Sequence, residues 1–240
     1  MGSPTLLVIG HDVAPETVLV QAGTLAAWAE DRGVHVVPGV AGTPMPDPSE
    51  VDAIAVLGSV QGAWDDDVPW LAEEIAMLTA AVAAGTPVLG ICFGGQLLAR
   101  VLGGRALPAA GLEENGWRTI TSEDPEIVAE GPWMEFHFDT FVTPPQAQRL
   151  DVSARSDQAF RDGVHLGVQF HPEITPASFE TWVARWAGTP LEARLPELGV
   201  STEGLRAETA ARAEDSRRAS WQLFDAFATG AGLPTRVVAR

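Results

Sequence analysis

The first half of the chain alternates short apolar runs, several of them closed by glycine, with longer segments of helical periodicity. The apolar runs predict buried strands at residues 5–10, 34–40, 53–58 and 88–91. The intervening segments predict one helix that ends near Arg32-Gly33 and another over residues 69–84, with the acidic triplet at 65–67 as its cap. This alternation favours an α/β fold of three layers, in which a mostly parallel central sheet has helices on both faces.

The second half of the chain carries shorter and less regular strand patterns. They lie at residues 105–107, 117–121, 136–142 and 164–170, and they predict a small antiparallel extension of the sheet. Helical periodicity returns at residues 176–187 and at about 203–228, with a loop predicted over residues 188–201 between them.

An apolar stripe runs along the last predicted helix and consists of Trp221, Leu223, Phe224 and Phe227. The stripe predicts docking of this helix onto its own domain, and a homodimer contact is the alternative. The sequence contains no internal repeat and no evident linker. We therefore expect a single domain over residues 1–240, with a helical extension at about residues 176–240.

The composition narrows the classes of chemistry and of partner. The formal net charge is −17, which argues against a nucleic-acid partner, because that binding depends on clustered basic side chains. All 15 basic residues are arginine, so Schiff-base lysine chemistry and a P-loop lysine are excluded within this sequence. Tyrosine is absent as well. Proton transfer must therefore rely on cysteine, histidine or carboxylates.

The sequence also bears on location and on bound groups. It contains no uncharged apolar run of membrane-spanning length, and its start lacks the pattern of a signal peptide, so we expect a cytoplasmic protein without membrane contact. The single cysteine permits no intrachain disulfide, which fits a reducing compartment. No cluster of residues has metal-ligand spacing, and we expect neither a metal nor another cofactor.

Cys92 stands where a predicted strand gives way to a predicted helix, with Gly90 and Gly94 on either side. A G-x-C-x-G turn is typical of a nucleophile elbow, which leaves the sulfur at the apex of a tight bend. The start of the following helix favours thiolate over thiol through its unpaired N–H groups. For a lone cysteine the ordinary interpretation is a small buried hydrophobic residue. The flanking glycines favour the nucleophile.

His171 and Glu173 follow another predicted strand in the sequence His171-Pro172-Glu173. A thiol nucleophile needs a base within hydrogen-bonding reach, and the base needs a third group that orients it. Two residues that are two positions apart at the end of a strand can project in the same direction. Taken alone, a histidine at a strand end is more often structural, so the prediction of a catalytic Cys92, His171 and Glu173 rests on the combination.

The segment 90–96, which reads Gly-Ile-Cys-Phe-Gly-Gly-Gln, and the His171-Pro172-Glu173 sequence together resemble the class I, or triad, glutamine amidotransferases. The resemblance covers about residues 5–175, since Gly58-Ser59 and the segment 114–117 also fall where that family has motifs. Within the family the chain looks most like stand-alone proteins similar to the amidotransferase domain of GMP synthase. The resemblance implies a flavodoxin-like fold. Gly95 and Asn115 depart from the pattern, at positions that could reshape the pocket.

The resemblance also implies roles for matching residues. Cys92 would attack the side-chain carboxamide of glutamine, His171 would move the proton and Glu173 would orient His171. The backbone N–H of Phe93 and one from the Gly58-Ser59 loop would form the oxyanion hole. The substrate would be held by Gln96 and by a covering loop made of Phe136, His137, Phe138 and Asp139. For His137 and Asp139, a loop histidine and a turn aspartate are equal alternatives, whereas His11, His35 and His165 are expected to be structural or solvent-facing.

Three functions are compatible with these residues. The leading one is a glutamine amidohydrolase whose ammonia is consumed by a synthetase on another chain, because the sequence shows no nucleotide-binding motif of its own. The second is a γ-glutamyl hydrolase or peptidase that acts on γ-glutamyl amides or peptides without a partner, through the same thioester. The third is a regulatory or binding module with a fossil site, which an intact triad disfavours.

Overall fold

The computed structural model describes residues 2–235 of the chain. Its centre is a nine-stranded sheet in the order β2-β1-β3-β4-β11-β10-β9-β6-β7, and a separate two-stranded sheet pairs β5 with β8. The strands are β1 Thr5–Gly10, β2 His35–Val40, β3 Ala53–Val56, β4 Val88–Ile91, β5 Arg105–Pro108, β6 Glu114–Ser122, β7 Gly131–His137, β8 Asp139–Val142, β9 Gln148–Val152, β10 Asp157–Asp162 and β11 His165–Val168.

Five neighbouring strands, from β2 to β11, are parallel, and the strands from β11 to β7 pair antiparallel. Every residue of β3, β4 and β11 is buried, as expected for strands covered on both faces. The expected α/β fold with a mostly parallel core and a small antiparallel part is confirmed. The antiparallel part joins the core through β11, which pairs with β4 on one side and β10 on the other.

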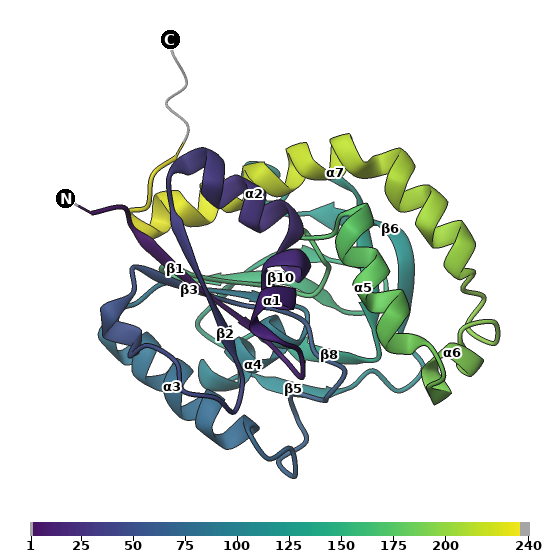
Figure 1. The fold of residues 1–240 in the computed structure, drawn as a ribbon, viewed down its shortest axis with the longest axis horizontal. Helices are drawn as coiled ribbons and strands as arrows, with labels where there is room; N and C mark the ends of the chain where they lie inside the picture. Colours follow the sequence, from purple (N-terminus) through teal and green to yellow (C-terminus); the bar gives the residue numbers. More distant parts are fainter. Residues whose placement is uncertain (1, 236–240) are drawn as a thin grey trace.

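Helices cover both faces of the sheet (Figure 1). They are α1 Pro15–Gln21, α2 Gly23–Arg32, α3 Leu71–Ala84, α4 Phe93–Val101, α5 Pro176–Trp186, α6 Pro190–Arg194 and α7 Thr202–Ala231. The side chains of β1 alternate between two hydrophobic clusters: Leu6 and Val8 belong to one, Leu7 and Ile9 to the other. The first cluster lies under α2 and α7, and the second lies under α3 and α4. The core is therefore split by the sheet into two layers.

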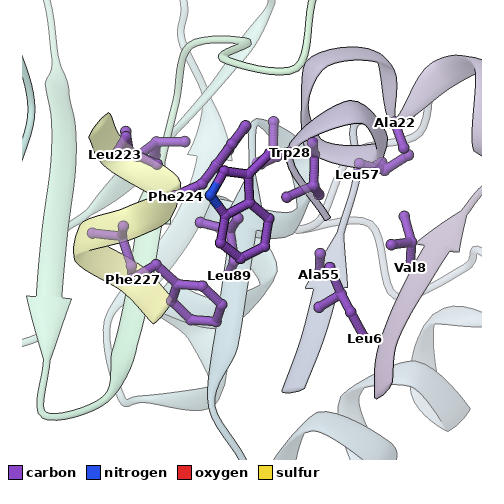
Figure 2. Packing of buried hydrophobic residues seen from close by; sticks show 14 of the residues in the cluster. Leu6, Val8, Ala22, Trp28, Ala55, Leu57, Leu89, Leu223, Phe224 and Phe227 are labelled. Carbon is purple, nitrogen blue, oxygen red and sulfur yellow. The ribbon is translucent and has the colours of Figure 1, made fainter. Parts of the chain in front are cut away.

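The apolar stripe of the last helix is buried inside its own chain. Leu223 and Phe224 are fully buried, and Phe224 meets Trp28 of α2 with ring centroids 6.0 Å apart. Figure 2 shows these side chains facing Trp28, close to Leu89 of the sheet. The prediction that the stripe docks on its own domain is confirmed, because α7 closes one face of the sheet (Figure 1).

Several details of the predicted elements were wrong. The helix predicted up to Arg32 is divided into α1 and α2 at Ala22-Gly23, because the backbone of Gly23 packs against the carbonyl of Glu173, where a Cβ would lie 2.1 Å from that oxygen. The acidic triplet does not cap α3, whose N-cap is Trp70. Instead Asp65 accepts from the N–H of Asp67 in a local turn, and Asp66 pairs with an arginine.

The second half of the chain differs more from the sequence pattern. The strand predicted over 136–142 is two strands, β7 and β8, which belong to different sheets. The pattern missed β9 and β10, because mixed polar residues occupy positions that pair within the sheet. The loop predicted over 188–201 contains the short helix α6, which begins at a proline. Among residues 2–235, no helix has both the length and the apolar character that crossing a bilayer requires.

Candidate active site

Cys92 occupies a strained turn between β4 and α4. Its backbone φ is 53° and its ψ is −108°, a conformation that an L-residue adopts only when the surrounding structure enforces it. The N–H of Cys92 donates to the carbonyl of Val168 in β11 at 2.8 Å, and its own carbonyl accepts from the N–H of Gln96 in α4. The turn is thus held from both sides, and it points the first turn of α4 at the sulfur.

Three glycines make this turn sterically feasible. A Cβ on Gly90 would lie 2.3 Å from the carbonyl oxygen of Gly94, and one on Gly94 would lie 2.1 Å from the carbonyl oxygen of Val56. At Gly95, which departs from the family pattern, an added Cβ would lie 2.4 Å from the carbonyl oxygen of Val168. Helix α4 therefore packs backbone to backbone against β3 and β11, and any side chain at these positions would push it away.

The thiol of Cys92 is buried but lines a cavity. Its Sγ atom accepts a long hydrogen bond of 3.6 Å from the amide Nε2 of Gln169, the residue that follows β11 by one position. The amide of Gln96 also contacts Gln169, at 3.3 Å. The sulfur thus lies at the N-terminus of α4, with an amide donor beside it.

His171 and Glu173 form a buried hydrogen-bonded pair. The ring Nδ1 of His171 lies 2.7 Å from Oε1 of Glu173, and both side chains are at most 5% exposed. Burial by itself disfavours the charged imidazole, but the negative charges of Glu173 and Cys92 outweigh it and raise the pKa of His171 well above 6.5. The contact with Glu173 therefore supports an imidazolium at this position.

The turn that carries this pair is anchored to both helices on one face of the sheet. The carbonyl of Pro172 accepts from the hydroxyl of Thr24 in α2 at 2.7 Å and from the hydroxyl of Ser220 in α7. The carbonyl of Glu173 accepts from the N–H of Thr24 at 2.9 Å. Because these donors are buried side chains and backbone, the turn has little freedom to reorient His171.

One cavity of about 150 Å³ joins the elbow to the His171 turn. Every residue that the sequence singled out for this site lines it, namely Cys92, His171, Glu173, Gly58, Ser59, Phe93, Gln96, Phe136, His137, Phe138 and Asp139. Segments from β3, β4, the β7–β8 connection and the end of β11 thus meet at a single place. Such a cavity at the carboxyl ends of parallel strands is where open α/β sheets bind ligands.

The predicted oxyanion hole lies beside the sulfur. Phe93 is the first residue of α4, so its N–H has no acceptor within the helix. On the other side, a Cβ added to Gly58 would lie 3.0 Å from Cε1 of His171 and 3.8 Å from Cβ of Cys92. The carbonyl of Gly58 is fixed at 3.1 Å from Nδ1 of His11. His11 is therefore structural, as expected, but it positions a wall of the cavity.

His137 sits in a buried cluster of acids on the cavity wall. Its Nδ1 lies 2.8 Å from the carbonyl of Asp139, while Nε2 lies 3.4 Å from Glu135 and 3.7 Å from Glu114. Burial opposes the charge on the ring, yet the two carboxylates prevail and raise the pKa of His137 to about 10. His137 is thus a buried imidazolium that ties the β7–β8 connection to β6, rather than an ordinary loop histidine.

Asp139 also differs from a simple turn aspartate. Its Oδ1 accepts from the indole N–H of Trp64 at 2.9 Å, so this cavity residue is held by a side chain from outside the cavity. Burial raises the pKa of Asp139, although the bond from Trp64 works against that change. The bridge joins the loop after β3 to the first residue of β8.

Several residues that the sequence did not single out also line the cavity. Trp182, Arg185 and Trp186 lie on α5, and Gln21 ends α1; all four line the cavity. The ring of Trp182 meets that of His171 edge-on, with centroids 4.5 Å apart. The spacing of residues 182, 185 and 186 on one helix face was the available signal, but nothing in the sequence showed which way that face points.

Metal ligation has no support in the described part of the chain. Among residues 2–235, no three histidine, cysteine, aspartate or glutamate side chains are grouped so that they could hold a metal ion. The acids around His137 are arranged to pair with the imidazolium.

Curated relatives share part of this sequence. A glutamine-hydrolyzing GMP synthase of Thermus thermophilus is 34% identical over 131 residues, which are 51% of this chain and 24% of that protein. A subunit of the glutamine-hydrolyzing GMP synthase of Sulfurisphaera tokodaii is 38% identical over 98 residues, which are 37% of this chain and 51% of that protein. The chain thus spans about a quarter of the length of the first of these relatives and half of the second.

Solved structures share the fold over nearly the whole chain. A glutamine amidotransferase from Thermotoga maritima superposes with a TM-score of 0.81 at 22% identity, covering 95% of this chain and 99% of that one. A glutamine amidotransferase from Methylobacillus flagellatus superposes with a TM-score of 0.80 at 21% identity, covering 100% and 99%. The family model for glutamine amidotransferase class-I matches residues 34–186, which is more than half of the sequence, so this chain belongs to the class-I glutamine amidotransferase family.

Proposed function

We propose that this chain hydrolyses the side-chain carboxamide of glutamine through a γ-glutamyl thioester on Cys92, and that the ammonia is used by a separate synthetase. The observation that carries the proposal is the meeting of Cys92, His171 and Glu173 in one cavity, with a hydrogen bond of 2.7 Å between the imidazole and the carboxylate. A nucleophile, a base and an orienting acid in contact are the parts that thiol acyl transfer needs.

In the first step the thiolate of Cys92 attacks the γ-carbonyl carbon, and a C–S bond forms. The C–N bond then breaks as His171 gives its proton to the departing ammonia. Water adds to the thioester with His171 now acting as base, and glutamate leaves. Glu173 keeps Nδ1 of His171 protonated, so that Nε2 serves the reacting atoms.

The developing oxyanion needs donors that are already aimed at it. The N–H of Phe93, at the first position of α4, and an N–H of the Gly58-Ser59 loop are the donors of this proposal. Both line the cavity with Cys92. Loss of one such donor lowers the rate by about 10²–10³-fold in comparable sites. Gln96 and the segment Phe136 to Asp139 form the walls that would hold the glutamyl group.

The transfer of ammonia to a separate synthetase is supported by the names of the relatives. Those names describe glutamine-hydrolyzing GMP synthases, and one of the proteins is named as a single subunit of that enzyme. This chain matches only a fraction of the longer relatives. We assign to it the glutamine-hydrolysing part of such a reaction, with the acceptor chemistry on a partner, in line with the relative that is named as a subunit.

Hydrolysis of other γ-glutamyl amides or peptides is the second candidate. The observation that favours it is the α5 wall beside His171, where the leaving group must sit, since that wall carries Trp182 and Arg185. Ammonia is too small to need such a wall. A binding module without catalysis is the third candidate, and a reactive Cys92 would exclude it.

The test measures glutamate release from glutamine by the parent chain and by Cys92→Ala, alone and with candidate synthetases. The parent should turn over and the variant should fall by about 10³-fold or more, since removal of a catalytic nucleophile leaves only residual catalysis. A chloroketone analogue of glutamine gives a second readout: because the chain has one cysteine, alkylation must appear as a single adduct on Cys92. Equal rates for parent and Cys92→Ala would overturn the thioester mechanism. If no candidate synthetase changes the rate of glutamate release, the proposed transfer of ammonia to a partner would be refuted.

A further inference from the structure

Among the described residues that line the cavity, Arg185 is the one lysine or arginine, in a chain whose net charge is −17. The cavity also holds the carboxylates of Glu173 and Asp139, which are engaged with His171 and Trp64. The bond-making and bond-breaking steps proposed for Cys92 and His171 do not involve this guanidinium. Its chemistry is specific, because a planar guanidinium offers a fork of donors that matches a carboxylate.

The guanidinium of Arg185 has donors to spare. Its Nη1 donates to the carbonyl of His11 at 3.2 Å. Within residues 2–235, no carboxylate lies inside the 4.0 Å ion-pair distance of this side chain, and Asp12 influences it only from farther away. The side chain is half-buried, and burial lowers its pKa, but a guanidinium remains charged at all physiological pH values. An anion that entered the cavity would therefore meet an unneutralised cation.

Arg185 lines the cavity from α5, the helix that packs against His171, the residue proposed to protonate the leaving nitrogen. The general acid must touch the leaving nitrogen, and the residue that packs on His171 is Trp182, at 4.5 Å between ring centroids. Arg185 is three residues farther along α5, so it shares a face with Trp182 one turn away. The carbonyl of His11, which holds the guanidinium, belongs to the residue whose ring contacts Gly58. Arg185 is thus tied to the wall next to the reacting atoms.

Two further features of this side suit a larger leaving group. The amide of Gln21, at the end of α1, is buried and lines the same cavity, and α1 packs against α5. Trp182 and Trp186 add an aromatic surface, with the ring of Phe136 stacked on Trp186 at 4.6 Å. Together these groups match an amino acid. The cation suits its carboxylate, the amide suits its backbone, and the aromatic wall suits its side chain.

We infer that the cavity has a leaving-group subsite for a carboxylate, in which Arg185 pairs with the free carboxylate of an amino acid linked through its nitrogen to the γ-glutamyl group. The substrate class is the γ-glutamyl dipeptides. This inference rests on the proposed thioester chemistry at Cys92 and adds the identity of the group that leaves. Glutamine would use the same acyl half of the site and leave this subsite empty.

The reaction balances without any further reagent. The Cys92 thiolate bonds to the γ-carbonyl carbon, the C–N bond to the amino acid breaks, and His171 protonates that nitrogen. Water then cleaves the C–S bond. The products are glutamate and the released amino acid, whose carboxylate has kept its charge and its contact with Arg185 throughout.

The experiment compares γ-glutamylglycine with γ-glutamylglycinamide, two compounds that differ only in the charge at the proposed subsite. The quantity is the ratio of their kcat/KM values in the parent, in Arg185→Gln and in Arg206→Gln. Arg206 of α7 forms an exposed pair with Glu180 and does not line the cavity, so its variant removes the same charge elsewhere. The parent should prefer the free carboxylate by about tenfold or more, as expected for a charge-assisted pair.

Arg185→Gln should bring this ratio close to one, while Arg206→Gln should keep the parental ratio. Because each ratio is taken within one protein, a general loss of folded enzyme cancels. Raising the salt concentration should weaken the parental preference. A parent without preference, or a preference that survives in Arg185→Gln, would overturn the subsite. Absence of turnover for glutamine and for both γ-glutamyl compounds would instead refute the proposed thioester chemistry.

Discussion

The α-carbon of Gly94 faces the carbonyl oxygen of Val56 so closely that a Cβ on Gly94 would lie 2.1 Å from that oxygen. The contact joins the first turn of α4 to β3, the strand that leads to Gly58. Because a backbone carbonyl cannot move aside as a side chain can, Gly94 sets how near the elbow comes to the Gly58-Ser59 loop.

Gly94→Ala should therefore destabilise the fold by about 3 kcal/mol or more and abolish labelling of Cys92, since α4 must shift away from the sheet. Thermal unfolding and mass spectrometry of the alkylated protein measure the two effects. Gly230→Ala is the matched control: it lies within α7, and an added Cβ there meets only the flexible end of Arg161. That variant should be neutral or slightly more stable, because alanine favours helices. Equal behaviour of the two variants would contradict the packing argument.

Glu173→Gln should lower the pKa of His171, because the carboxylate charge that offsets burial is removed. The imidazolium is then lost at lower pH, so the alkaline limb of the pH profile of kcat/KM should move to lower pH. The rate at neutral pH should fall by about 10- to 10²-fold, because the neutral amide of the introduced glutamine does not stabilise the charged ring of His171 as the carboxylate does. Steady-state kinetics across pH 5 to 10 would test this. A uniform loss of rate with an unshifted alkaline limb would argue that Glu173 has only a structural part.

Asp151→Asn should stabilise the protein on the alkaline side of neutrality. Burial raises the pKa of Asp151 to about 8 from an ordinary 3.8, and its Oδ2 has no hydrogen-bond partner in the described chain. The folded protein thus keeps a proton that the unfolded chain releases near pH 4. Stability contributed by this group is complete below about pH 4 and is lost as the pH rises through about 8.

The measurement is the melting temperature of the parent and of Asp151→Asn at pH 5 and pH 8.5. The difference between the two proteins should grow in favour of the variant at the higher pH, and Glu180→Gln, which removes a carboxylate from an exposed pair with Arg206, should show little change. His137 loses its own stabilising proton only toward its pKa of about 10, in both proteins alike, so the comparison isolates Asp151. If the difference in melting temperature between the two proteins is the same at both pH values, Asp151 is ionised in the folded state.

Ser220→Ala should loosen the turn that presents His171. The hydroxyl of Ser220 reaches from α7 to the carbonyl of Pro172, and its loss should lower the free energy of unfolding by about 1 kcal/mol and reduce kcat with little change in KM. Ser216→Ala, one helical turn earlier, is the matched control, because its buried hydroxyl has no hydrogen-bond partner within the described residues. That variant should match the parent. If both serines behave alike, the long helix does not support the turn.

The fold class, and many of the residues that line the cavity, could be predicted from local sequence patterns. Apolar runs closed by glycine identified the parallel strands, and the G-x-C-x-G turn located the elbow. Prediction failed where pairing over long distances decides the structure. Strands β9 and β10 carry charged residues and are held in place by neighbours, and α1 is separated from α2 by a contact of Gly23 with Glu173, 150 positions away.

What the sequence by itself determined is the set of groups available for chemistry: one thiol, no lysine, and a histidine two positions from a glutamate. The tertiary structure alone decided their surroundings. It buried His137 between two carboxylates, bridged Asp139 to Trp64 and turned Trp182 and Arg185 of α5 into the cavity. The physical reason is that charge and direction at a site depend on what lies within a few ångströms in space, and here those neighbours come from segments far apart along the chain.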